Sequence, residues 1–187
     1  MHRTLGIALA VIVLALATYA GSRYLANGLG SAALPQQHLI RYSSEEGVTF
    51  EYPDSYVLSS RTEGSAERRW DVLVLMPKGA TLPQNGEGPP AITVGIYPNP
   101  EGLTLEQWVH GDARSNWKLI IDDRASTTTT VGDVPALWYH YSGLYEVDSV
   151  ATVHGGKVFL FSVDWLDPQD TTREDFNRML DTVTFIQ

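Results

Sequence analysis

The sequence predicts an α+β domain, in which an antiparallel sheet of about six to eight strands is flanked by helices as an α/β/α sandwich. Two observations support it. Most of the chain alternates short strand patterns with turn residues, and two segments, starting at Thr104 and near Asp170, change to a helical period. A third observation, a charge-free apolar run near the start, places one N-terminal hydrophobic helix before this domain.

Composition restricts the classes of function. The chain has 187 residues, of which 43% are apolar, enough for one core of ordinary size. Beyond Ala26 there are 11 basic and 22 acidic residues, a formal charge of 11 − 22 = −11. This charge argues against nucleic-acid binding and against a polybasic membrane patch. The lack of cysteine excludes disulfides, thiolate metal sites, a cysteine nucleophile and lipid attachment to an amino-terminal cysteine.

Residues 1–25 are predicted to be a signal anchor or transmembrane helix. The charge-free run from Leu5 to Ala20 would form a helix of about 24 Å, and extension to Leu25, with Arg23 at the interface, would complete a span of about 30 Å. We expect a single-pass protein whose acidic C-terminal domain lies outside the cytoplasm, in the periplasm or on the cell surface. Cleavage after Ala20 is the alternative and would give a secreted protein.

Residues 26–42 are expected to be a flexible linker between the anchor and a globular domain at 43–187. The segment from Ala26 to about Gln37 is rich in Gly, Ala, Gln and Pro and has no apolar period. A linker of this kind holds a domain on the order of 20 Å from the bilayer.

The first half of the domain carries three strand patterns. In the segment from Gly47 to Tyr56, apolar residues alternate with polar ones as far as Pro53, which should end the strand or place it at a sheet edge. The apolar run 70–77 predicts a more central strand, and 92–96 predicts another. Between them, residues 78–90 are expected to form a long exposed loop because they are rich in glycine and proline.

The second half contains both expected helices. Thr104 and Gln107 have the spacing of a capping box, and Leu105, Trp108 and Val109 form an apolar stripe. Strands are predicted at 126–131, 135–141, 145–153 and 157–163, with a tight turn at 154–156. A second helix should begin near 170–172, followed by a short last strand at 183–186.

These patterns resemble the PsbP-like domain over roughly residues 43–187. Gly47, Phe50, Pro53 and Tyr56 look like its entry segment, and the following segments resemble later parts of the domain in order: 91–109, 131–143, 154–163 and 176–185. The resemblance implies an α/β/α sandwich shared with extrinsic photosystem II subunits, Ran-binding Mog proteins and mycobacterial lipoproteins. It also implies binding or assembly without an established enzyme mechanism. The apolar leader lacks the Arg- and Ser-rich character of a plastid transit peptide, so we expect a membrane-anchored, bacterial-type member.

The chain contains few signs of catalysis. It has no G-x-S-x-G elbow, no H-E-x-x-H helix, no phosphate-binding glycine loop and no dinucleotide fingerprint. We therefore predict no catalytic residues, no cofactor and no metal. Two weaker constellations are a Ser142 and His140 nucleophile pair, and a metal site of His140 and His154 with Asp148 and Asp164. A turn at the strand end explains the first, and a polar sheet face explains the second without a ligand.

Aromatic residues crowd the strands near 140. Alternation sends Trp138 and His140 to one face of the sheet and Tyr139 and Tyr141 to the other. Helices over both faces would bury both sets, whereas an uncovered face would present a candidate partner surface of Trp138, His140 and Tyr145. The loop 78–90 is a second candidate contact region.

Taken together, these observations predict a membrane-tethered, extracytoplasmic domain that binds a protein partner or assists assembly, and is not an enzyme. Its expected partners are the membrane, through the N-terminal helix, and a protein, with no nucleic acid. The alternatives are a tethered or secreted hydrolase-like enzyme with an unrecognised site, or a carrier of a small ligand or metal. An enzyme requires a buried polar constellation in a pocket, whereas a binding domain requires an exposed apolar patch.

Overall fold

Two antiparallel sheets and two α-helices form the described part of the computed structural model, which covers residues 37–186 except 67, 81–87 and 121–124. The expected N-terminal helix at 1–25, and the linker as far as residue 36, lie outside the described residues. Within the described residues, every helix is too short or too polar to span a membrane. The elements are β1 (Leu39–Ser43), β2 (Val48–Pro53), β3 (Tyr56–Ser65), β4 (Arg68–Pro77), β5 (Ile92–Pro98), α2 (Leu105–Gly111), the 3-10 helix η1 (Asn116–Leu119), β6 (Ser126–Val131), β7 (Val134–Ser142), β8 (Glu146–His154), β9 (Lys157–Trp165), α3 (Thr171–Asp181) and β10 (Thr184–Phe185).

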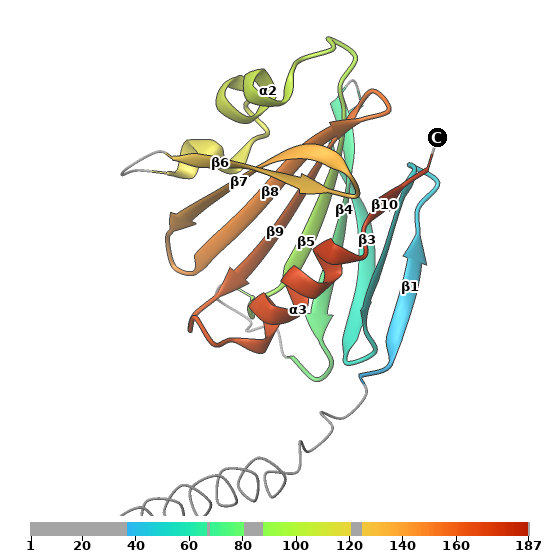
Figure 1. Cartoon of the computed structure of the whole chain (residues 1–187), viewed down its shortest axis with the longest axis vertical. Helices are drawn as coiled ribbons and strands as arrows, with labels where there is room; N and C mark the ends of the chain where they lie inside the picture. Colours follow the sequence, from blue (N-terminus) through green and yellow to red (C-terminus); the bar gives the residue numbers. More distant parts are fainter. Residues whose placement is uncertain (1–36, 67, 81–87, 121–124, 187) are drawn as a thin grey trace, which may run out of the picture. The chain divides into compact units, whose positions relative to one another are not determined.

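The larger sheet has seven strands in the order β3-β4-β5-β9-β8-β7-β6, and β1, β2 and β10 form a separate three-stranded sheet. All neighbouring strands are antiparallel. The predicted α+β class, with an antiparallel sheet flanked by helices, is confirmed. In Figure 1, α3 crosses in front of the large sheet, α2 lies at the top, and β1 lies at the right of the view.

Each face of the large sheet carries its own apolar core. Along β9, Phe159 and Phe161 point to one face and Leu160 to the other, because side chains alternate along a strand. The first core also contains side chains of α3 and of the small sheet, including Phe50, Phe176 and Met179. The second contains Trp108 and Val109 of α2 and Trp117 of η1. The sheet is therefore covered on both sides.

Local sequence signals set several boundaries. The capping box at the start of α2 is present, since Gln107 N–H donates to Thr104 Oγ1 and Thr104 N–H donates to Gln107 Oε1. The side chain of Asp170 caps α3 by accepting from Thr172 N–H. Gly132 and Asp133 both have positive φ, 54° and 63°, as required by a two-residue type I′ turn between β6 and β7.

Two strands differ from what the sequence predicts. β1 begins at Leu39, inside the predicted linker 26–42, and β3 was not predicted. Most side chains of both strands are exposed, so neither strand has the apolar alternation that marks a buried face. β2 ends at Pro53, as expected, and is the middle strand of the small sheet.

We predict that Gly132→Ala destabilises the domain more than Gly155→Ala. Both glycines have a φ near 55°, so both substitutions cost about 1–2 kcal/mol of backbone strain. A Cβ at Gly132 would also lie 2.9 Å from the carbonyl oxygen of Val183, whereas a Cβ at Gly155 has no neighbour within 4 Å. Urea unfolding should show the difference, and equal losses would contradict the packing of this turn against β10.

We further predict that the free energy of unfolding falls as the pH rises above about 10. Burial raises the pKa of Tyr97 to about 12 and raises the pKa of Tyr56 and Tyr139 even further. Below pH 10 the stability from these neutral phenols is fully present. Above it, the unfolded phenols ionise first, and each should remove about 1.4 kcal/mol per pH unit until its folded pKa is reached. Urea unfolding from pH 8 to 11 measures this, and a constant stability would contradict it.

Candidate functional site

The three residues of the predicted partner surface do not lie on one surface. Trp138 and His140 point to the α3 side of β7, with their rings stacked at a centroid distance of 6.4 Å. Trp138 is half-buried against the core of that face. Tyr145 instead lines a cleft with Tyr141 and Val147, whose side chains point to the opposite face.

His140 belongs to a cluster of charged side chains that links β7, β8 and α3. Its Nδ1 lies 2.9 Å from Asp148 Oδ1, and its Nε2 lies 2.8 Å from Glu146 Oε2. Arg173 Nε of α3 donates to the other oxygen of Asp148 at 2.6 Å. Asp148 is only 3% exposed, so its carboxylate depends on these two hydrogen-bonding partners, of which Arg173 carries the opposite charge.

These contacts hold β7, β8 and α3 together, and we call the cluster of His140, Glu146, Asp148 and Arg173 the clamp. Ser142 Oγ donates to Glu146 Oε1 at 2.8 Å, and both ring nitrogens of His140 face carboxylates. The arrangement therefore lacks the hydroxyl-to-imidazole contact that activates a serine nucleophile. The guanidinium of Arg173 also lies over the ring of Trp165, 4.4 Å from its centroid, which fixes α3 on the sheet.

His154 is remote from this cluster. It stacks on Phe185 at 4.9 Å, near the turn between β8 and β9. His140 pairs with Asp148, and the six residues from there to His154 span about 20 Å of strand. The alternative metal site of His140 and His154 is therefore wrong, because their nitrogens cannot converge on one ion. Among the described residues, no three His, Asp or Glu side chains are arranged to hold a metal.

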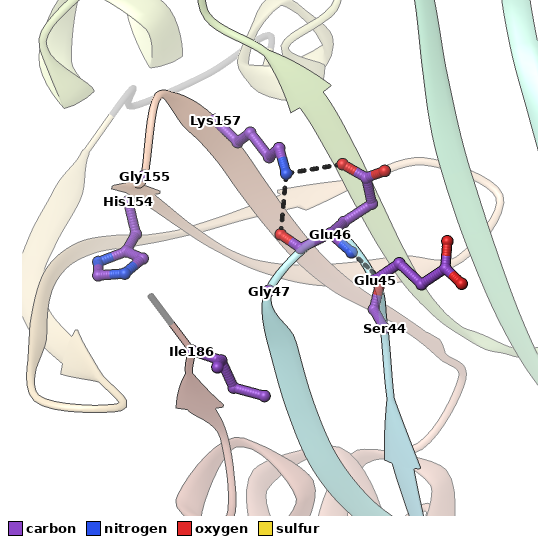
Figure 2. Close-up of a pocket in the computed structure, with 8 residues that line it drawn as sticks. All are labelled: Ser44, Glu45, Glu46, Gly47, His154, Gly155, Lys157 and Ile186. Atoms are coloured by element: carbon purple, nitrogen blue, oxygen red, sulfur yellow. Dashed lines mark hydrogen bonds and ion pairs between the residues drawn. The ribbon is translucent and has the colours of Figure 1, made fainter.

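A cavity of about 490 Å³ lies between the β1–β2 turn and the β8–β9 turn. Figure 2 shows Lys157 reaching toward Glu46, with His154 and Ile186 across from Glu45 and Glu46. Lys157 Nζ lies 2.7 Å from Glu46 Oε2 and donates to the carbonyl oxygen of Glu46 at 3.0 Å. Lys157 thus ties the small sheet to the large one, and its charge is already compensated within the domain.

A second cleft, of about 400 Å³, lies at the end of the β7–β8 hairpin. The Tyr145 hydroxyl donates to the carbonyl oxygen of Gly88 at 2.7 Å, which holds the end of the 78–90 loop against the hairpin. Leu144 lines this cleft and is 65% exposed. Leu166 is also 65% exposed and directly follows Trp165, the β9 residue that pairs with Glu146. We call the set Pro89, Tyr141, Leu144, Tyr145 and Leu166 the hairpin-end surface.

The hairpin-end surface is the better candidate for a binding site. Leu144 and Leu166 are each 65% exposed, and Tyr141 and Tyr145 are half-buried in the cleft, whereas the charged groups around Asp148 and in the Figure 2 cavity are paired within the domain. Burial, and then the nearby charge of Asp164, raises the pKa of Tyr141. Sequence reasoning identified Tyr145 and the 78–90 loop, but it missed Leu144 and Leu166, because an isolated leucine beside a turn carries no distinguishing pattern.

Comparison with known proteins identifies the fold. No protein-family model and no curated protein matches the chain. The solution structure of cyanobacterial PsbP (CyanoP) from Synechocystis sp. PCC 6803 is similar, with a TM-score of 0.52 and 14% identity over 84% of this chain and 99% of that chain. LpqN, involved in cell envelope biogenesis of Mycobacterium tuberculosis, matches with a TM-score of 0.42 and 18% identity over 81% of this chain and 91% of that chain. The predicted PsbP-like fold is confirmed.

We predict that Arg173→Met destabilises the domain by about 2–4 kcal/mol, because it leaves the buried Asp148 carboxylate with one partner fewer. Arg178→Met on the same helix is the matched control. Arg178 is half exposed and pairs mainly with exposed Glu174, so its loss should cost less than about 1 kcal/mol. Urea unfolding of both variants tests this, and similar losses for the two would contradict the clamp.

Proposed function

We propose that the chain is a membrane-tethered, extracytoplasmic domain that binds a protein partner at the membrane surface and does not catalyse a reaction. The tether follows from the apolar run of residues 5–20 and its flanking arginines. The fold alone does not define a function, because one scaffold hosts many unrelated activities. The proposal therefore depends on the surface chemistry of the domain.

The observation that carries the proposal is the hairpin-end surface. Leu144 exposes most of its side chain in the aromatic cleft of Tyr145, and the equally exposed Leu166 directly follows the β9 residue that pairs with Glu146 at the start of β8. Burying one such leucine is favourable by about 1.5–3 kcal/mol, so a partner that covers both gains a central apolar contact. Tyr145 adds an aromatic ring that is already fixed by its hydrogen bond to Gly88 and loses little freedom on binding.

The arrangement of charged groups supports a role without catalysis. Within the described residues, the buried Asp148 forms an ion pair with Arg173 and contacts His140, and Lys157 forms an ion pair with Glu46. Groups paired in this way stabilise the contacts between layers. None of these pairs presents a nucleophile next to a free base, which is the arrangement that acid–base catalysis needs.

Crosslinking in native membranes tests the proposal. A photo-crosslinking amino acid replaces Leu144 in the full-length chain, and a matched control replaces Val57, an exposed apolar residue of β3. We expect Leu144 to capture one specific protein that Val57 does not, with at least about tenfold enrichment, and Leu144→Lys to prevent binding by placing a charge in the apolar contact. Repeated recovery of the chain alone, or equal capture from both positions, would contradict the proposal.

A further inference from the structure

β6 is an end strand of the seven-stranded sheet, and among the described residues it pairs only with β7. Its six residues, Ser126–Val131, contain four consecutive threonines and carry no charge and no proline. Thr127, Thr128 and Thr130 are exposed. Threonine is β-branched and favours the extended backbone, so this edge is already in the conformation that accepts another strand.

The hairpin turn determines which backbone groups of β6 are free. The two-residue type I′ turn at Gly132 and Asp133 makes Val131 and Val134 a hydrogen-bonded pair. Because hydrogen-bonded pairs alternate along an antiparallel ladder, Thr127 and Thr129 also bond to β7. The N–H and C=O groups of Thr128 and Thr130 therefore point outward, and in the described part of the chain they meet no hydrogen-bonding partner.

The opposite edge of the same sheet is protected in the usual way. β3 carries the ion pair of Arg61 and Glu63 on its exposed side chains. It also contains Gly64, whose φ of 93° departs from extended geometry. Charges and irregular backbone are devices that prevent strands from adding to an edge. Their absence from β6 distinguishes this edge.

We propose that β6 binds an extended segment of a partner protein by strand addition, and that this segment forms β structure readily and carries basic residues. The inference rests on the proposed function in that it names the kind of partner. Backbone hydrogen bonds to Thr128 and Thr130 supply the pairing. Basic residues on the segment complement the acidic domain, including Asp133 at the end of β6.

A second copy of the chain is a poorer occupant for the same edge. Two β6 strands can pair antiparallel, but each domain carries a formal charge of −11 beyond Ala26. The repulsion between two such domains opposes the contact, whereas a basic segment is attracted. Self-association is thus a distinct outcome of the test.

The first test uses a synthetic peptide of alternating valine and threonine with a lysine at each end. At a peptide concentration about ten times the Kd, amide hydrogen exchange at Thr128 and Thr130 in the full-length chain should slow about tenfold, because only the bound fraction is protected. A version of this peptide that is N-methylated on alternate residues has no N–H donors along one of its edges. It should pair with β6 only through its other edge. When both edges are N-methylated, no protection should appear. Protection by the fully N-methylated peptide, or a dimer of the chain that protects β6 without peptide, would overturn the proposal.

Two substitutions at Thr128 test the contribution of the β6 backbone to binding. Thr128→Pro removes an outward N–H that makes no bond to β7, and Thr128→Val keeps this N–H together with a β-branched side chain. We expect peptide affinity to fall at least about tenfold for proline and to change less than about threefold for valine. Retained exchange protection at Thr127 and Thr129 shows that the proline variant is folded. If the proline variant does not fold, the binding of the N-methylated peptides to the native chain tests the proposal instead. Equal affinity of the two folded variants would overturn the proposal.

A photo-crosslinker at Thr128 in native membranes separates the two proposals. Capture of the same partner from Thr128 and Leu144 supports both. Capture from Leu144 alone overturns strand addition and leaves the proposed function standing. If the peptide binds β6 but no partner is captured from either position, the proposed function is contradicted. The proposal that β6 binds an extended basic segment would still stand.

Discussion

The large sheet is apolar on both faces, and the rest of the domain is arranged to cover it. Phe159, Leu160 and Phe161 are consecutive and buried, so neither face of β9 can meet water. α2 and η1 cover one face, and α3 with the small sheet covers the other. An antiparallel sheet with one solvated face would have needed only one of these layers.

This constraint decides where a partner can bind. The layers are held by polar links between elements, of which the clamp at Asp148 and the link from Lys157 to Glu46 are the main ones in the described structure. Both faces of the sheet are therefore covered by other elements of the domain. The edge strand β6 and the end of the β7–β8 hairpin, which we call the rim of the sheet, remain open to a partner. The hairpin-end surface offers apolar side chains there, and β6 offers free backbone groups.

The sequence predicts the parts of this domain that depend on local pattern. β2 ends at the predicted Pro53, the capping box at Thr104 starts α2, and the predicted strands of the second half all form. β3 could not be predicted, since its exposed side chains carry no apolar period and its position comes from pairing with β4. The polar links could not be predicted either: 111 residues separate Lys157 from Glu46, and no motif marks such a pair. For the same reason, the sequence does not reveal that Trp138 packs against the core on the α3 side, or that His140 pairs with Asp148, which Arg173 of α3 also contacts.

The most direct test of this account is amide hydrogen exchange of the full-length chain in native membranes, compared with and without its captured partner. If the partner binds the rim and both faces stay covered, protection from exchange should increase in β6 and in the β7–β8 turn, while α2 and α3 keep their protection. Loss of protection in α2 or α3 on binding would contradict the account, because it would mean that the partner displaces a covering helix and binds a face of the sheet.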